Sequence, residues 1–140
     1  MQSQPPDAVT DSQPPDLGEI VVLNRDLFFG VRIGNTLRGL GYRVSFTPDS
    51  PAFAARITDT EPLPVLGVID MSAGADWQSI QSLTARADVS TPLLVFGSHM
   101  DVDGLRAAKA AGVTRVVSNG DFHRGMVDLV RRYARRPDTG

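Results

Sequence analysis

Short aliphatic runs alternate with segments of helical periodicity along most of this 140-residue chain. The first run, Ile20-Val21-Val22-Leu23, is continuous rather than alternating, as expected of a strand that is buried on both faces. Four further runs follow, at residues 42–46, 65–69, 93–96 and 113–117. Apolar residues recur at helical spacing between and after them, over residues 27–40, 48–57, 77–87, 101–111 and 121–133. This alternation predicts an α/β domain whose parallel sheet is covered by helices on both faces.

Five strands in so short a segment favour a doubly wound, flavodoxin-like (βα)5 fold with a five-stranded parallel sheet in the order 2-1-3-4-5. In that order the topological switch lies between the first and third strands, and ligands of such folds bind beyond the carboxyl ends of the strands. The residues that follow these strand ends are therefore the candidate site: Asn24, Arg25, Asp26, Asp70, Met71, Gly97, Ser98, His99, Ser118 and Asn119.

The first 17 residues differ from everything after them. They contain four prolines and three aspartates but no aromatic residue, and the pentad Ser-Gln-Pro-Pro-Asp occurs twice, at 3–7 and 12–16. We predict a disordered, Pro-rich acidic tail over residues 1–17, with a Pro-rich docking motif as the alternative. The folded domain is then expected over residues 18–136, followed by a flexible C-terminus at 137–140.

The composition excludes several kinds of site and partner. Cysteine is absent, which removes disulfides, thiolate metal sites and a cysteine nucleophile. A net charge of −2 provides no overall attraction to nucleic acid or to an anionic membrane. No apolar run approaches the ~20 residues of a membrane span, and the N-terminal residues lack the features of a secretory signal. We therefore expect a cytoplasmic protein.

Two stretches resemble the receiver domain of two-component response regulators. The first is a buried strand that ends in an aspartate, Val65-Leu66-Gly67-Val68-Ile69-Asp70. In the second, Pro92-Leu93-Leu94-Val95-Phe96 precedes the segment Ala107-Ala108-Lys109-Ala110-Ala111-Gly112-Val113. The resemblance covers residues 19–134 and implies the receiver fold, with Asp70 at the position of the phosphoacceptor.

The other positions of the receiver site depart from the family pattern. The resemblance implies an acidic pair after the first strand that holds Mg²⁺, a Ser or Thr after the fourth strand and a Lys after the fifth. Asn24 and Arg25 stand at the acidic pair, Gly97 at the hydroxyl position with Ser98 one residue later, and Ser118 at the lysine position. An Arg about 5 Å from Mg²⁺ would repel it by roughly 6–7 kcal/mol at an effective dielectric of 20. The pattern is that of a degenerate receiver, or pseudo-receiver.

The roles of Asp26 and Asp70 follow from these departures. Asp26 is better placed as the N-cap of the helix over residues 27–40 than as a metal ligand. Asp70 without its metal ligands is expected to bond to nearby backbone N–H groups or to pair with Arg25, which would then occupy the space of Mg²⁺. No metal or other cofactor is expected, Mg²⁺ being required only if Asp70 is phosphorylated after all.

Two other kinds of chemistry could use the same edge of the sheet. Ser98, His99 and Asp70 together suggest a hydrolase, but adjacent residues of an extended chain point to opposite sides and no Gly-x-Ser-x-Gly turn is present. His99 and His123 are too few for a zinc site, which needs three or four ligands. We therefore expect no enzymatic activity, and His99 as a polar loop residue or a partner contact.

Basic and aromatic residues suggest surfaces for a partner. In receiver-like folds the face formed by the fourth helix, the fifth strand and the last helix mediates dimerisation or output docking, and here it would bear five cations: Arg106, Lys109, Arg131, Arg132 and Arg135. The cations of the last helix are expected to complement the dipole at its C-terminus, with contact to an acidic protein as the alternative. Nucleic acid is not expected to bind a net-acidic chain. Phe28 and Phe29 are consecutive, so one can face the sheet while the other lies elsewhere; core packing of both is the prediction.

The sequence thus predicts a stand-alone, receiver-like signalling protein that acts by protein–protein contact without Mg²⁺-dependent aspartyl phosphorylation. A histidine kinase, a separate output protein or a second copy of the chain would be its partner, and neither a membrane nor nucleic acid is expected. Two alternatives stay open: a phosphorylatable response regulator that uses Asp70 in a phosphorelay, and a small-ligand-binding flavodoxin-like domain with an apolar pocket beside Ser98 and Ser118.

Overall fold

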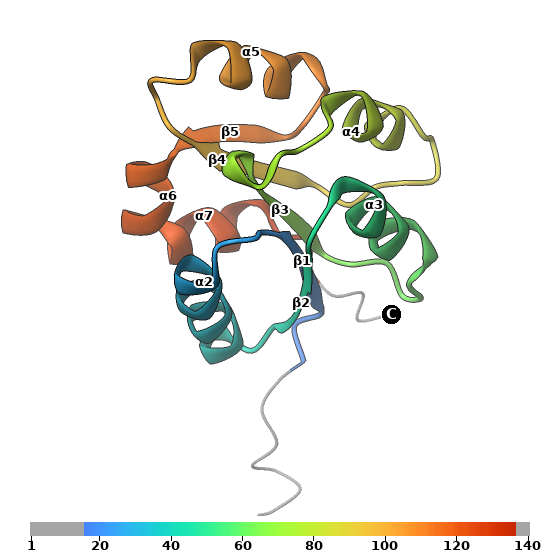
Figure 1. Cartoon of the computed structure of the whole chain (residues 1–140). Helices are drawn as coiled ribbons and strands as arrows, with labels where there is room; N and C mark the ends of the chain where they lie inside the picture. The colour runs from blue at the N-terminus through green and yellow to red at the C-terminus, as the bar shows by residue number, and fades with distance from the viewer. Residues whose placement is uncertain (1–15, 137–140) are drawn as a thin grey trace, which may run out of the picture.

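A computed structural model describes residues 16–136, which form one five-stranded parallel sheet with helices on both faces (Figure 1). The strand order is β2-β1-β3-β4-β5, as the sequence predicts. The strands are β1 (Glu19–Leu23), β2 (Arg43–Thr47), β3 (Leu66–Asp70), β4 (Leu93–Gly97) and β5 (Arg115–Ser118). The helices are α2 (Leu27–Leu40), α3 (Ser50–Asp59), the short 3₁₀ turn η1 (Met71–Ala73), α4 (Trp77–Thr84), α5 (Val102–Ala110), α6 (Asn119–Arg124) and α7 (Met126–Tyr133).

The continuous aliphatic runs are explained by the two layers of helices. Every residue of β1, β3 and β4 is buried, because successive side chains point to opposite faces and both faces are covered. On one face Val22 and Val68 pack against α2, α6 and α7, whereas on the other Val21 and Ile69 pack against α3, α4 and α5. The edge strands β2 and β5 are only partly buried, in agreement with their more polar sequences.

Short polar side chains set the helix starts at the carboxyl ends of the strands. Asp26 is the N-cap of α2, and its carboxylate accepts hydrogen bonds from the backbone N–H groups of Phe28 and Phe29. Gly41 ends the same helix with φ 109°, a left-handed conformation that glycine adopts without steric cost. The predicted cap at Asp26 is confirmed, and α2 has the predicted range, residues 27–40.

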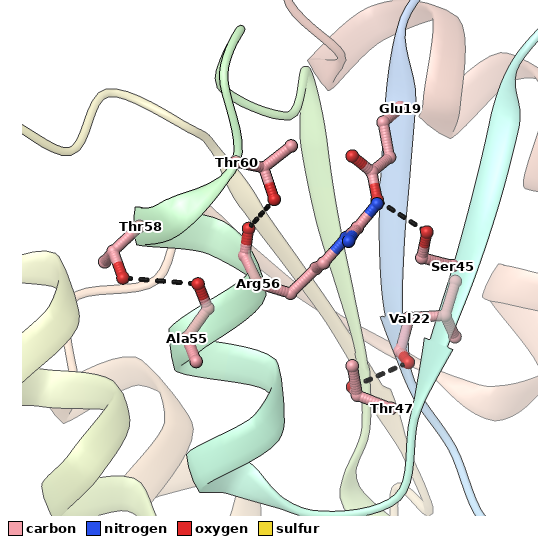
Figure 2. Close-up of polar contacts among 8 residues, drawn as sticks. All are labelled: Glu19, Val22, Ser45, Thr47, Ala55, Arg56, Thr58 and Thr60. Atoms are coloured by element: carbon pink, nitrogen blue, oxygen red, sulfur yellow. Dashed lines mark hydrogen bonds and ion pairs between the residues drawn. The ribbon is translucent and has the colours of Figure 1, made fainter.

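A buried carboxylate ties β1 to α3. Glu19 is 2% exposed, and its Oε2 accepts hydrogen bonds from Nε of Arg56 at 2.6 Å and from the hydroxyl of Ser45 at 2.5 Å. Figure 2 shows the Arg56 side chain reaching from α3 across to Glu19 at the start of β1. Nearby, the hydroxyl of Thr47 donates to the carbonyl of Val22 at 3.0 Å. The polar face of β2 therefore contributes to the attachment of α3.

The structure differs from the sequence prediction at several boundaries. The last helix is interrupted at Gly125, so that α6 and α7 replace a single helix over residues 121–133. Helix α4 ends at Thr84 and leaves Ala87 exposed, outside the apolar stripe assigned to it. No helix within residues 16–136 combines the length and apolar character that a membrane crossing demands.

The folded domain begins before Gly18. The backbone N–H of Leu17 donates to the carbonyl of Gly41 at 3.0 Å, and the Asp16 carboxylate pairs with Nε of Arg43 at 3.2 Å. The Asp16 carboxylate also accepts from the backbone N–H of Gly18, so both Asp16 and Leu17 belong to the domain rather than to a tail. The remainder of the predicted tail, residues 1–15, and the predicted flexible C-terminus, residues 137–140, lie outside the described residues.

Candidate functional site

Asp70 lies at the carboxyl end of the central strand β3, beside the topological switch between β1 and β3. Its side chain is on the same face of the sheet as Val68, because alternate residues of a strand share a face. Asp70 is 2% exposed. Its Oδ1 accepts hydrogen bonds from the backbone N–H of Ser72 at 2.9 Å and from the Ser72 hydroxyl at 2.7 Å. The predicted bonding of Asp70 to a neighbouring backbone N–H group is confirmed.

The second carboxylate oxygen of Asp70 has no such support. Oδ2 is buried, and no residue between 16 and 136 provides it with a hydrogen-bond partner. A buried acceptor without a partner costs about 1–3 kcal/mol, and more when the group is charged. The site therefore keeps one unsatisfied oxygen in its interior, which a cation or a donor group of a partner could satisfy.

Asn24 and Asp26 are used locally and do not reach Asp70. The Oδ1 of Asn24 accepts from the backbone N–H of Asp26 at 2.7 Å, and its Nδ2 donates to the carbonyl of Asp26 at 3.2 Å. Both ends of the Asn24 amide are therefore occupied within its own turn. Asp26 in turn caps α2. The strand-to-helix turn after β1 is thus organised to start α2, not to present ligands toward β3.

The predicted ion pair between Arg25 and Asp70 is wrong. Arg25 is exposed, and no ion pair within the described part of the chain includes either residue. The physical reason is the turn made by Asn24 and Asp26, which directs the intervening Arg25 toward solvent. The guanidinium therefore does not occupy the space of a metal ion beside Asp70.

These side chains do not fit Mg²⁺, the ion that the resemblance to receiver domains implies beside Asp70. Mg²⁺ requires near-octahedral oxygen ligands, normally including one or two carboxylates. Across residues 16–136, no three His, Cys, Asp or Glu side chains gather closely enough to hold a metal ion. Asn24 and Asp26 have their oxygens engaged at the helix start, and Arg25 adds a positive charge.

A methionine fills the space at the position where the family has a hydroxyl residue. Gly97 is buried at the end of β4, and a Cβ atom built on it would lie 2.8 Å from Cβ of Met71 and 2.9 Å from its Cγ, with Sδ closer still. The Met71 methyl group continues toward Gly104, where a Cβ atom would lie 2.6 Å from Cε. Two glycines thus make room for the Met71 side chain, and a hydroxyl side chain at residue 97 would collide with it.

The remaining predicted site residues have structural partners of their own. The Ser98 hydroxyl accepts from the backbone N–H of Met100 at 3.1 Å, and both Ser98 and His99 are exposed in the loop before α5. The Ser118 hydroxyl accepts from the backbone N–H of Asp121 at 3.0 Å and caps α6. Ser98 is therefore engaged with its own loop rather than held against an imidazole as a nucleophile would be.

His123 lies in an aromatic cluster that the sequence did not reveal. Its ring stacks on Phe29 with centroids 4.6 Å apart, and it meets Phe96 and Phe122 edge-on at 5.5 and 5.2 Å. Both ring nitrogens are buried without a hydrogen-bond partner among the described residues. Burial lowers the pKa of His123, the positive charge of Arg32 lowers it further, and the charge of Asp70 acts in the opposite direction.

The signal for this cluster was the spacing of His123. Residues 123, 126 and 130 are separated by three and four positions, so the imidazole lies on the apolar stripe that includes Met126 and Val130. Phe29 packs against the same core, whereas Phe28 is 77% exposed. The prediction that both phenylalanines pack in the core is therefore wrong for Phe28.

Of the five predicted partner-face cations, Arg106 and Lys109 lie on α5, and Arg131 and Arg132 lie on α7. These two helices pack on opposite faces of the sheet, which ends at the edge strand β5. That the cations serve as one partner surface stays a prediction. Arg131 acts electrostatically on Tyr42, beside the end of α2. Arg135 donates its backbone N–H to the carbonyl of Val65 and its guanidinium to the hydroxyl of Ser90, toward the amino end of β3.

No protein-family model matches the sequence, and no curated protein matches it either. Solved structures do match. The receiver domain of a signal transduction histidine kinase from Syntrophus aciditrophicus is 14% identical, with a TM-score of 0.72 over 83% of this chain and 89% of the other. The receiver domain of the TMAO respiratory system response regulator TorR is 16% identical, with a TM-score of 0.70 over 82% and 94%. The chemotaxis response regulator CheY4 of Vibrio cholerae is 13% identical, with a TM-score of 0.70 over 84% and 98%. The chain therefore has the receiver fold.

Proposed function

We propose that this chain is a receiver-fold signalling protein that acts through protein–protein contact, without Mg²⁺-dependent phosphorylation of Asp70 and without enzymatic activity. The observation that carries the proposal is the isolation of Asp70. Its Oδ1 is held by Ser72, and the neighbouring Asn24 and Asp26 are committed to the start of α2. A metal-dependent phosphoryl transfer needs cations that neutralise the charge developing on the phosphoryl oxygens, and these side chains offer no place for one.

The packing of Met71 supports the same proposal. In a receiver that switches, a hydroxyl group after the fourth strand reaches the phosphoryl oxygens, and here Gly97 at this position has no side chain. The Met71 side chain covers Gly97 instead and holds the loop between β3 and α4 against the start of α5. An arrangement of this kind favours a single state of the loop rather than a switch between two.

Exposed apolar side chains next to this edge support contact with another protein. Met100 and Val102, in the loop after β4 and at the start of α5, are 77% and 55% exposed. They lie in sequence beside the exposed His99, so a polar and an apolar contact are available together. We propose a histidine kinase or a separate output protein as the partner, with a homodimer as the other form of contact.

The proposal that the site does not bind Mg²⁺ is tested by restoring the missing carboxylate ligands. Isothermal titration of the wild-type chain with Mg²⁺ should give no heat of binding in the millimolar range, because the ligand set is absent. The variant Asn24→Asp/Arg25→Asp should gain measurable Mg²⁺ binding, since it removes the Asn24 Nδ2 donor that helps to hold this turn and lets the turn present two carboxylates toward β3. The same substitutions combined with Asp70→Asn form the matched control, and they should lose that gain. Saturable Mg²⁺ binding by the wild-type chain that Asp70→Asn removes would contradict the proposal.

One observation favours the alternative, a phosphorylatable response regulator. The buried and unpaired Oδ2 of Asp70 is a free acceptor at the phosphoacceptor position, and covalent modification there would relieve its lack of a partner. The small-ligand alternative has less support. The apolar hollow of about 390 Å³ that the structure shows lies between α2 and β2, lined in part by Leu27 and Phe46, rather than beside Ser98 and Ser118.

A further inference from the structure

An apolar groove runs between α2 and the edge strand β2. Leu27, Val31 and Phe46 line it and are 86%, 63% and 41% exposed, and its volume is about 390 Å³. Phe46 lies close to the helix because Gly34 has no side chain there; a Cβ atom at Gly34 would lie 3.3 Å from the Phe46 ring. Contiguous exposed apolar residues of this size, one of them aromatic, are typical of a surface that binds another segment of chain.

Two arginines flank the groove. Arg25 lies near the start of α2 and Arg38 in its last turn, and both are among the lining residues. Neither has an ion-pair partner within residues 16–136. The one carboxylate that lines the groove, Asp26, is engaged in capping α2. The groove therefore combines an apolar floor with two cations at its ends, which is complementary to an acidic segment with apolar residues.

The described part of the chain begins near one end of this groove. The backbone N–H of Leu17 donates to the carbonyl of Gly41, and the N–H of Gly41 donates to the carbonyl of Arg38. The first described residue, Asp16, thus lies next to the end of α2 that bears Arg38. Fifteen residues precede it in the sequence, and this stretch contains Asp7 and Asp11 but neither Lys nor Arg.

The second copy of the repeated pentad shows one contact that its aspartate makes with the domain. In the second copy, residues 12–16, the aspartate pairs with the guanidinium of Arg43 at 3.2 Å. The first copy, residues 3–7, presents the same Pro-Pro-Asp sequence. Pro-rich segments dock in aromatic-lined grooves as preformed polyproline II helices, and here Phe46 supplies the aromatic ring. In the first copy, the two prolines are therefore suited to packing against Phe46, and the aspartate is suited to pairing with an arginine of the groove.

We propose that residues 3–11 of this same chain dock in the groove between α2 and β2, with Pro5 and Pro6 against Phe46 and with Asp7 and Asp11 paired to Arg25 and Arg38. The reach is sufficient. Asp7 and Asp16 are nine residue steps apart, about 28 Å at the ~3.1 Å per residue of polyproline II, whereas α2 from Leu27 to Arg38 is about 17 Å long. A tether this short gives an effective concentration on the order of millimolar, so weak contacts suffice for docking.

The experiment uses paramagnetic relaxation in the full-length chain. The protein has no cysteine, so Ser3→Cys provides a single site for a nitroxide label. We expect the label to broaden the amide signals of Gly30, Val31 and Phe46 and to leave those of Arg106 and Lys109 on α5 sharp. A mixture of labelled protein without ¹⁵N and unlabelled ¹⁵N protein should show no broadening, because docking occurs within one chain.

Charge variants test the pairing. Arg38→Gln, or Asp7→Asn, should lower the docked-to-free ratio about two- to fivefold, the range expected for one exposed ion pair. Arg106→Gln on α5 is the matched control and should leave the broadening unchanged. Arg38 is exposed, so its replacement should leave the amide spectrum of the fold intact. Absent broadening in the groove, broadening that is uniform over the surface, or equal broadening in the mixed sample would each overturn the proposal; the last result would assign the groove to a second copy.

Discussion

At the scale of single residues, the candidate site is shaped most by Met71. The Met71 side chain lies over Gly97 and Gly104. A Cβ atom at residue 97 would collide with the Cβ and Cγ atoms of Met71. These atoms are close to the backbone and cannot move away as the end of a flexible side chain can. The glycine at residue 97 and the methionine at residue 71 are therefore two parts of one packing arrangement.

Gly97→Ala tests this arrangement directly. The added methyl group should lower the free energy of unfolding by about 1–3 kcal/mol, the usual cost of overpacking. In a Met71→Ala background the same substitution should cost distinctly less, because the colliding atoms beyond Cβ are gone. Urea unfolding followed by the fluorescence of the single tryptophan, Trp77, measures both values. An equal cost in the two backgrounds would show that Met71 does not fill the space at Gly97.

His123 makes a second prediction at this scale. Burial lowers its pKa from the ordinary value of 6.5, so the folded protein binds a proton at His123 less readily than the unfolded chain does. Stability should therefore be complete above pH 6.5 and decline as the pH falls toward the lowered pKa, because the unfolded state is protonated first. Below the lowered pKa both states are protonated, and this contribution stops changing.

The measurement is the urea midpoint between about pH 5 and 7, above the range in which ordinary carboxylates titrate. His123→Phe should remove most of the pH dependence in this window while keeping the aromatic packing. His99→Gln, in the exposed loop after β4, is the control and should retain it. If the urea midpoint of His123→Phe still depends on pH in this window, another titrating group causes the effect.

At the scale of secondary-structure elements, the attachment of α3 to β1 depends on one buried charge. Arg56→Ala would leave the Glu19 carboxylate buried with only the Ser45 hydroxyl as a partner. We expect a loss of about 1–3 kcal/mol in the free energy of unfolding, less than for a fully buried pair because the Arg56 side chain is 47% exposed. Urea denaturation measures this loss.

Arg86→Ala is the matched control. It removes the exposed ion pair with Asp88 and should leave the free energy of unfolding nearly unchanged. An equal loss in Arg56→Ala and Arg86→Ala would contradict the role assigned to Glu19.

The elements themselves were largely predictable from the sequence. The continuous aliphatic runs identified the buried strands, and Asp26 marked the start of α2, because these signals are local. The boundaries that failed depend on packing. Gly125 interrupts the last helix, although its N–H still donates to the carbonyl of Asp121. Because of this helical hydrogen bond, the apolar spacing continues from α6 into α7, and the sequence does not reveal the break. Ala87 continued the stripe of α4 by spacing alone, but the helix ends at Thr84.

At the scale of the whole molecule, the topology was predictable and the details of the site were not. The strand order followed from the number of strands and the crossover rule, and it correctly placed Asp70 at the switch point. The absence of the Arg25–Asp70 pair depends on how Asn24 bonds within its own turn, which spacing does not reveal. Nor does the sequence reveal that Met71 occupies the space above Gly97, since this contact joins two loops from different strands.

The central claim is that Asp70 does not accept a phosphoryl group by the metal-dependent route of receiver proteins. Intact-mass spectrometry of the full chain after incubation with acetyl phosphate and Mg²⁺ tests it most directly. We expect the mass of the unmodified chain, both for the wild-type protein and for Asp70→Asn, because Asn24, Arg25 and Asp26 hold no metal ion beside the carboxylate. The mass of one added phosphoryl group in the wild-type protein, absent from Asp70→Asn and abolished by removal of Mg²⁺, would contradict the account.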